Sequence, residues 1–475
     1  MTRNSVPRTT RQQIEASDRM NSEGEKKMIE HDRRNKPRQR HFAAAQAAGA
    51  RAGVLREDQD IYIPGRFDSV ENEHISPPGA SVSLQSIELA NLGIRRALVH
   101  QQVEAVLAVE DGRGDPHGMW PTILTLLYTG DLVTAHAECR RLAKDARWSG
   151  SPRHQEVLTL LRARISLLGG HGAEASGLLG AQLTRGLSPH LAGLAVAWLI
   201  EAHVLSGELG QAHQVLRAHG LAGRLDTNPP DLVHILAARG ALQQAAGQFQ
   251  HSLKDFMACG RLLAERQVAN PAVIPWRSRA SSAALATQQG DLALALAEEE
   301  LAVARTWGSP RCIGLALHAV AVARRDDTSV ALLEEAVALL HLAYARGELI
   351  RVLHDLGTLQ IDRRNLSAGR RHLEVALMVA RESGNRLWQH SLESALKRLD
   401  VPSLTSQELH IGQLASAGYS NRQIAETLFL ATRTVEFHLS SVYRKLAISG
   451  RNELHAALHT ERLSPLGVDH LSSAV

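Results

Sequence analysis

The sequence predicts an all-α protein: a long helical repeat region followed by a small helical domain near the C-terminus. Of 475 residues, 44% are hydrophobic but only 4% are aromatic, and Ala and Leu are abundant. Strands prefer aromatic and β-branched residues, so this composition favours helix over sheet. A regular spacing of turn residues over 84–399 and sharply marked helix ends after Leu404 predict the two regions. A chain of this length is typical of two or three domains.

The first segment, residues 1–83, is predicted to be disordered. It is rich in charged and polar residues, as in EGEKK and HDRRNKPRQRH, and it offers little apolar surface to bury. Two interpretations of its basic runs stay open: non-specific contacts with nucleic acid, or a solvated tail that binds nothing. Residues 463–475 are predicted to be a flexible tail.

A short signature recurs in residues 84–399. A glycine is followed five positions later by Ala or another small residue, and units begin at Gly130, Gly170, Gly207, Gly247 and Gly290. They lie 37 to 43 residues apart, and two further steps of 37 reach Asp327 and Arg364. Such a period is typical of helix-turn-helix repeats of the tetratricopeptide (TPR) kind. We therefore expect a TPR-like α-solenoid whose concave surface binds a ligand or partner.

Residues 400–462 are predicted to form a domain of four short helices. Thr405 and Glu408 make a T-x-x-E capping box that starts the first helix, and Gly418 is placed to end it. A second capping box, Ser420 with Gln423, opens the second helix.

A third helix is predicted from about Arg433 to Leu446. Its apolar residues follow the i, i+4, i+7, i+11 pattern of one buried stripe, at Val435, Leu439, Val442 and Leu446. Ser449 is placed to cap a fourth helix, whose apolar face is Leu454, Ala457 and Leu458.

A short helix, a tight turn and a longer helix with a polar, partly basic outer face are typical of a helix-turn-helix motif. Its second helix fits the major groove of DNA. The candidate phosphate contacts are Arg433, Thr434, His438, Arg444 and Lys445. Backbone amides at a helix N-terminus bind phosphate, which points to Ser420 and Asn421. The candidates for base readout are Glu436, Phe437 and Ser440.

Spaced positions along this domain carry a family resemblance: Leu404, Thr405, Glu408, Gly418, Ser420, Asn421, Ile424, Ala425, Leu428, Thr434, Val435, His438, Lys445 and Leu446. Together they resemble the DNA-binding domain of the LuxR family of bacterial regulators. Two positions depart from the family pattern, with Ala431 where a capping Ser or Thr is usual and Ala447 where Gly is usual. The resemblance implies that two such domains pair through the last helix, with the seam at Leu454, Ala457 and Leu458.

Segments of the repeat region carry a second resemblance, at Asn270-Pro271, Ile274–Ser278, Trp307-Gly308 and Leu332–Ala336. They resemble the C-terminal half of the large ATP-binding, MalT-like LuxR regulators, which place an ATPase domain before the repeats. A phosphate-binding loop needs a Gly-Lys pair, and the chain contains no Gly-Lys dipeptide. We therefore do not expect the ATP-driven switch of that family in this chain, and we expect no cofactor.

Other function classes find little support. The sequence holds no G-x-S-x-G or HExxH motif, and His455 with His459 lacks an evident third metal ligand. We therefore expect no enzyme and no metal site. Three widely spaced cysteines, Cys139, Cys259 and Cys312, suit a reducing cytoplasm. No apolar run of transmembrane length appears, so we expect no membrane association.

We therefore expect a sequence-specific transcriptional regulator that binds double-stranded promoter DNA as a homodimer. The helical repeats would sense a protein or small-molecule effector, RNA polymerase is a further expected partner, and the location would be the cytoplasm, on the nucleoid. Abundant Ala, Leu and Arg resemble an actinomycete protein. Two alternatives stay open: a repeat-based interaction scaffold, and one half of a split ATPase regulator.

Overall fold

The computed structural model describes residues 63–64, 80–108, 116–223, 231–400, 404–446, 448–455 and 457–458. Every regular element within these ranges is a helix, which confirms the predicted all-α class.

Two parts of the predicted disordered segment are ordered. Ile63 and Pro64 are buried, and the indole Nε1 of Trp120 donates a 2.8 Å hydrogen bond to the carbonyl oxygen of Pro64. The first described helix begins at Ala80, before the expected boundary. The rest of the segment and the predicted tail 463–475 lie outside the described residues.

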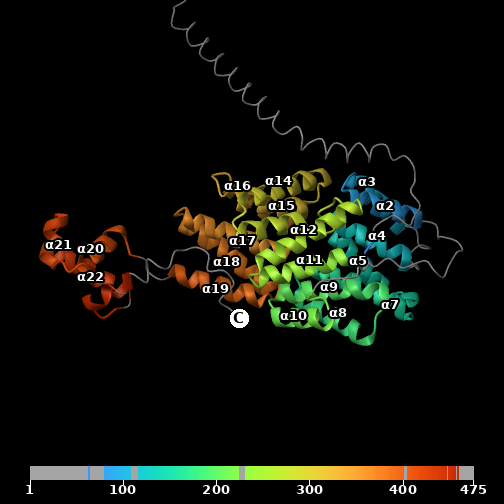
Figure 1. Ribbon diagram of the computed structural model, residues 1–475, viewed down its shortest axis with the longest axis horizontal. Coiled ribbons are helices and arrows are strands. Elements are labelled where there is room, and N and C mark those ends of the chain that lie inside the picture. The colour runs from blue at the N-terminus through green and yellow to red at the C-terminus, as the bar shows by residue number, and fades with distance from the viewer. Residues whose placement is uncertain are drawn as a thin grey trace, which may run out of the picture. The chain divides into compact units, whose positions relative to one another are not determined.

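The repeat region is a succession of helix pairs, which Figure 1 shows from blue to orange. Each first helix packs against its own partner and against the first helix of the next pair. The pairs are α2 (Ala80–Leu92) and α3 (Arg96–Ala108), α4 (Pro116–Thr129) and α5 (Leu132–Leu142), α7 (Pro152–Leu168) and α8 (Gly172–Arg185), α9 (Pro189–Ser206) and α10 (Leu209–Ala218), α11 (Leu232–Ala245) and α12 (Phe249–Glu265), α13 (Trp276–Ala286) and α14 (Gly290–Trp307), α15 (Pro310–Arg324) and α16 (Ser329–Leu342), and α17 (Arg346–Asp362) and α18 (Leu366–Glu382). The short α6 (Ala146–Ser149) precedes α7, and α19 (Arg386–Asp400) packs on α18. This is the predicted α-solenoid.

At four of the turns that the recurrent signature marks, a left-handed glycine ends the first helix of the pair, as predicted. The backbone φ is +90°, +87°, +79° and +73° at Gly130, Gly170, Gly207 and Gly247, a region that glycine enters without Cβ strain. The small residue five positions later is fully buried in each pair, at Ala135, Ala175, Ala212 and Ser252. The second helix can therefore approach the first closely.

The next two units depart from the predicted register. The pattern places a turn at Gly290, but the left-handed residue is Gln288, with φ of +60°, and Gly290 is the first residue of α14. The buried small residue is accordingly Ala293. Likewise, the left-handed residue between α15 and α16 is Arg325, two positions before Asp327. Side chains other than glycine at these turns concealed the register from the sequence pattern.

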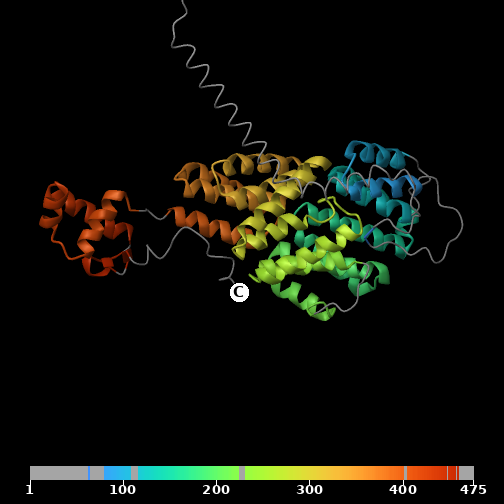
Figure 2. The ribbon, with the colours of Figure 1, turned by 45° about the horizontal axis from the view of Figure 1, so that its top comes forward.

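The solenoid returns on itself, because turns within the first four pairs lie against loops that follow the fifth and later pairs. Figures 1 and 2 both place the blue and teal helices beside yellow ones. Hydrogen bonds join residues 175 to 180 positions apart: Asn270 to Ala90 (2.6 Å), Trp307 to Tyr128 (2.8 Å), Arg346 to His171 (3.2 Å) and Asn385 to Leu205 (3.0 Å). The second superhelical turn is thus stacked directly on the first.

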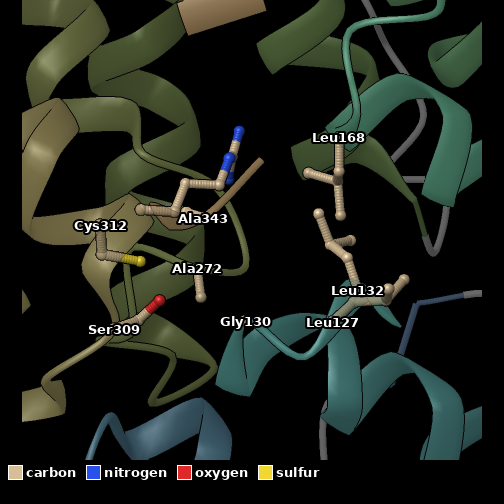
Figure 3. A pocket seen from close by; sticks show the side chains of 9 residues that line it. Leu127, Gly130, Leu132, Leu168, Ala272, Ser309, Cys312 and Ala343 are labelled. Atoms are coloured by element: carbon tan, nitrogen blue, oxygen red, sulfur yellow. The ribbon is translucent and has the colours of Figure 1, made fainter. Parts of the chain in front are cut away.

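A small cavity marks this contact. Figure 3 shows Leu127, Gly130, Leu132 and Leu168 of the first turn opposite Ala272, Ser309, Cys312 and Ala343 of the second. Its volume of about 10 Å³ is at the lower limit of the ~10–15 Å³ that one water requires. The two turns are therefore closely packed, and this cavity is too small for a ligand.

One of the described helices, α9, has 18 residues and a mean hydropathy of 1.2, so by length and composition alone it could cross a membrane. It packs against α7, α8, α10 and α11, and its side chains at Leu191, Trp198 and Ile200 are buried. These contacts make α9 a core helix of the solenoid.

Replacing Gly170 by Ala should destabilise the repeat region by about 1–3 kcal/mol, because a non-glycine residue is strained at this positive φ. In addition, a Cβ there would lie 2.8 Å from the backbone nitrogen of Gly347. Gly177→Ala is the matched control, since nothing lies within 4 Å of its Cβ position in α8 and Ala is favoured there by ~0.5–1 kcal/mol. Urea unfolding followed by tryptophan fluorescence measures both variants. Equal stabilities would contradict the close stacking of the two turns.

Candidate nucleic-acid interface

The C-terminal domain has a hydrophobic core of its own. Its helices are α20 (Ser406–Ser416), α21 (Asn421–Leu428) and α22 (Thr432–Lys445), followed by the 3-10 turn Arg451–Glu453 and helical residues 454–455 and 457–458. The fully or nearly fully buried side chains are Ile411, Ala415, Ile424, Ala425, Val435, Leu439, Val442, Leu454 and Leu458.

Both predicted capping boxes are confirmed. The amide of Glu408 donates to Thr405 Oγ1 at 3.2 Å, and the amide of Thr405 donates to the Glu408 carboxylate at 2.7 Å. Ser420 and Gln423 make the same reciprocal pair, at 3.3 and 2.8 Å. Each box satisfies amides that the first turn of a helix leaves without a partner.

The turn between α21 and α22 is sharp and exposed. Phe429 adopts a left-handed conformation with φ of +55°, and its side chain is 95% exposed. The N-cap of α22 is Ala431, which makes no side-chain capping bond, in agreement with the departure seen in the sequence. Ala447, the other departure, lies outside the described residues.

One face of α22 is buried and the opposite face is free, as predicted. Val435, Leu439 and Val442 are at most 3% exposed. The exposed side chains of the helix centre on the opposite face, and the predicted contact residues among them are Arg433, Glu436, Phe437, Ser440 and Arg444. A helix with 3.6 residues per turn brings these five to one side. They form what we call the reading face.

The remaining predicted residues lie at its margins. Thr434 and His438 are half-buried on the flank of α22, with the imidazole of His438 edge-on to Phe437 at 5.9 Å between ring centroids. Ser440 donates its hydroxyl proton to the carbonyl of Glu436 at 2.8 Å. Ser420 is exposed and Asn421 is half-buried at the start of α21.

Lys445, predicted as a phosphate contact, forms an ion pair inside the domain. Its ammonium is 2.6 Å from the Glu408 carboxylate, and the two side chains are only 16% and 7% exposed. Glu408 also accepts a 2.7 Å hydrogen bond from the hydroxyl of Ser441. Lys445 lies on the flank of α22, where it ties this helix to the start of α20. Its cation is thus used inside the domain.

Glu408 was predicted only as a capping residue, yet it connects two helices. Burial raises the pKa of its carboxyl group, but hydrogen bonds from Lys445, Thr405 and Ser441 overcome this effect and lower the pKa to about 2. Glu408 is therefore ionised near neutral pH. The sequence contains one signal for this connection between α20 and α22: Lys445 lies away from the centre of the reading face.

The predicted seam residues have different environments. Leu454 and Leu458 are 0% and 7% exposed, respectively, and belong to the core of the domain. They lie close to Gly412, since a Cβ there would be 3.6 Å from Leu454 and 3.7 Å from Leu458. Ala457 alone is half-exposed. The two leucines thus serve the folding of the domain itself.

The geometry supplies what DNA binding needs. The reading face belongs to a helix whose other side is fixed in a core, and it presents acidic, aromatic, hydroxyl and basic groups together. In the described part of the chain, neither Arg433 nor Arg444 has a partner in an ion pair or hydrogen bond. A capped helix, a sharp turn and this second helix define a helix-turn-helix domain.

Comparison with known proteins assigns the domain to a family. Residues 402–457 match the family described as bacterial regulatory proteins, luxR family. The C-terminal domain is therefore a helix-turn-helix domain of the LuxR family.

The similarity to curated regulators is confined to this end of the chain. A Mycobacterium tuberculosis protein named as an HTH-type transcriptional regulator is 46% identical over 52 residues, which is 11% of this chain and 6% of that protein. LiaR of Bacillus subtilis, a transcriptional regulatory protein, is 36% identical over 75 residues, which is 16% of this chain and 34% of LiaR. DegU of Brevibacillus brevis is 38% identical over 69 residues, which is 14% of this chain and 29% of DegU. The chain thus spans about a third or less of the length of these relatives.

Among solved structures, a Rap protein complexed with competence and sporulation factor matches 72% of this chain and 95% of its own, with a TM-score of 0.43 and 10% identity.

Replacing Glu408 by Gln should destabilise α20 and α22 by about 1–3 kcal/mol, because it removes a buried charge-assisted pair. The matched control is Glu426→Gln, whose exposed pair with Arg422 is worth under ~1 kcal/mol. Hydrogen exchange of the amides in residues 406–445 of the full chain measures the local stability. Equal protection in both variants would contradict the anchoring role.

The same carboxylate predicts an acid transition. A folded pKa of about 2 lies below the ordinary ~4.3, so the unfolded state binds the proton more tightly. The stabilisation is complete above pH ~4.3 and is lost as the pH falls towards 2. In Glu408→Gln this step should disappear from the pH dependence of amide protection.

Proposed function

We propose that this protein is a sequence-specific transcriptional regulator that binds double-stranded promoter DNA through the reading face of α22. The observation that carries the proposal is the exposed face opposite Val435, Leu439 and Val442. The LuxR-family membership of the domain and the regulator names of its relatives support it. B-DNA admits one α-helix in its major groove, and α22 is a helix of 14 residues with one side free.

The groups on this face divide into two roles. The guanidinium groups of Arg433 and Arg444 neutralise phosphates, which positions the domain without reading sequence. Thr434 and His438 add contacts at the flank. The amide of Ser420 donates to Gln423, so at the start of α21 it is the backbone amide of Asn421, beside the exposed Ser420, that is offered to a phosphate.

Base readout falls to the acidic, aromatic and hydroxyl side chains of the reading face. The carboxylate of Glu436 accepts from cytosine N4, and the ring of Phe437, 72% exposed, contacts a thymine methyl. The hydroxyl oxygen of Ser440 retains acceptor capacity towards a base edge.

We further propose that the protein binds DNA as a homodimer, with half-sites about one helical turn apart. The seam expected at Leu454, Ala457 and Leu458 is reduced to the surface around Ala457, because both leucines are in the core. The repeats would sense a protein or small-molecule effector, and the bound dimer would act on RNA polymerase in the cytoplasm, on the nucleoid.

Two other functions make different predictions. An interaction scaffold would bind its partner through the repeats and would keep that activity after residues 401–475 are deleted. One half of a split ATPase regulator would require a separate P-loop protein before it selects a DNA site. The free reading face favours the regulator.

The deciding experiment is selection from random duplexes by the full chain without ATP, alongside a fragment of residues 395–475. Enrichment of one inverted-repeat site by both supports a competent regulator. Enrichment by the fragment alone supports a regulator whose repeats control access to DNA. No enrichment by either would refute the proposal and favour the scaffold.

Glu436→Ala should relax the preference for one base pair, with a loss of discrimination of about 1–3 kcal/mol. Arg444→Ala should weaken binding to all sequences alike and lower the salt slope by about 1. Lys445→Ala should instead reduce the stability of the domain, as Glu408→Gln does. Selection and salt titration of the three variants separate these effects. An unchanged base preference in Glu436→Ala would remove this residue from readout.

A further inference from the structure

One edge of the first superhelical turn is covered, and the opposite edge is open. The first helix of a pair ends at a turn that lies against the second superhelical turn, and the second helix runs back towards the other edge. A Cβ at Gly207, between α9 and α10, would lie 2.6 Å from the side chain of Leu387. At Gly186, after α8, and at Gly220, after α10, no described atom lies within 4 Å of the Cβ position. The C-terminal ends of the second helices thus form an uncovered edge.

Cations follow one another along this edge. The last turn of α5 carries Arg140 and Arg141, that of α8 carries Arg185, and that of α10 carries Arg217. Lys144 lies two residues beyond the end of α5. We call Arg140, Lys144, Arg185 and Arg217 the basic rim. Since α5, α8 and α10 belong to successive pairs of the superhelix, the rim is a row of cations.

The positive charge of the rim is not neutralised by the described residues. All four side chains are exposed, and among the described residues none of them has an ion pair or a hydrogen bond. The acids beside them already have partners, in the pairs Glu138 with Arg141 (2.9 Å), Asp145 with Arg147 (2.8 Å) and Glu156 with Ser188 (2.7 Å). The four cations are therefore available to an anionic partner.

At α5 the rim also has room for a bound group. A hollow of about 290 Å³ is lined by Ala137, Arg140, Arg141 and Lys144. Three of these four side chains are cationic, and the Nη2 atom of Arg141 is buried without a hydrogen-bond partner among the described residues. Guanidinium and ammonium groups form short, charge-assisted hydrogen bonds with phosphate oxygens. The hollow thus offers several donors to one oxyanion.

The chemistry of this edge fits a nucleic acid better than a protein. Protein interfaces are centred on buried aromatic and apolar side chains. From residue 134 to residue 341, none of the described large apolar side chains is exposed, so the rim has no such centre. Contacts with a phosphate backbone require only cations and polar donors, and double-stranded DNA carries one negative charge per ~1.7 Å of its axis. A row of cations is complementary to this linear polyanion.

We propose that the basic rim binds the phosphate backbone of double-stranded DNA, in addition to the contacts of the reading face. The rim adds affinity without reading sequence, because phosphates carry no sequence information. The inference rests on the proposed function only for DNA beside a selected site. Binding of the rim to DNA of any sequence is measured separately.

The test is binding of the full chain to a long duplex of random sequence, followed by fluorescence anisotropy over a series of salt concentrations. The triple substitution Arg140→Gln, Arg185→Gln and Arg217→Gln, the rim variant, should reduce the magnitude of the slope of log K against log salt by about 2–3. Each phosphate contact contributes about 0.9 to this slope. An unchanged slope would overturn the proposal.

The matched control removes the same charge from the second helices of the second superhelical turn. It combines Arg261→Gln, Arg305→Gln and Arg371→Gln, three exposed arginines that have no ion pair or hydrogen bond among the described residues. The control should keep the slope of the unsubstituted chain. If the slope fell equally in both triple variants, the effect would be one of net charge alone, and the rim would be refuted.

A second variant separates phosphate contacts from a structural role. Cations in the last turn of a helix also interact favourably with the helix dipole, and Arg305 has this position in the control. The Tm of the two triple variants should therefore be similar. Replacing the three rim arginines by Lys should restore the slope, because a phosphate contact needs the charge. A Lys variant that binds as weakly as the Gln variant would refute the contacts.

Labelled poly-L-glutamate is the probe for an acidic protein in place of DNA. We expect the rim variant to lose affinity for the duplex. If it lost only the binding of poly-L-glutamate and kept the duplex slope, the rim would bind an acidic protein and the assignment to DNA would be wrong.

Selection of a DNA site by the same variants separates the two proposals. A reduced slope in the rim variant together with no selected site would leave the rim standing and refute the sequence-specific regulator. A selected site with equal slopes in the rim and control variants would support the regulator and refute the rim.

Discussion

The repeat region depends on the stacking of its second superhelical turn on its first. Turns that end the early helices meet loops between later pairs, and hydrogen bonds such as Trp307 to Tyr128 join residues nearly 180 positions apart. Gly170 illustrates the constraint, because a side chain there would collide with the backbone of Gly347. Glycine at this turn therefore serves both the left-handed conformation and the close approach of the second turn.

This return has an electrostatic consequence. An ion pair joins helices of pairs that are not adjacent along the chain, from Arg279 of α13 to Glu201 of α9. Glu201 of α9 is shared by Arg164 of α7 and Arg279 of α13. An open solenoid would leave such groups fully hydrated.

In the C-terminal domain, one carboxylate links folding to function. Glu408 caps α20 and also holds Ser441 and Lys445 of α22, which fixes the rotation of α22 about its axis. The core residues Val435, Leu439 and Val442 fix the same rotation from the other side. The reading face therefore belongs to a helix that is held by contacts on its other sides.

The sequence by itself determined the all-α class, both capping boxes and the buried stripe of α22, because each depends on residues within a few positions of one another. It also located five of the repeat turns, four at a left-handed glycine and one at Arg364, whose φ is +65°. Tertiary structure alone decided the turn at Gln288, the return of the solenoid and the core positions of Leu454 and Leu458. It also assigned Lys445 to Glu408, a partner 37 residues away. No local pattern encodes such a contact, since it exists only once distant helices have packed together.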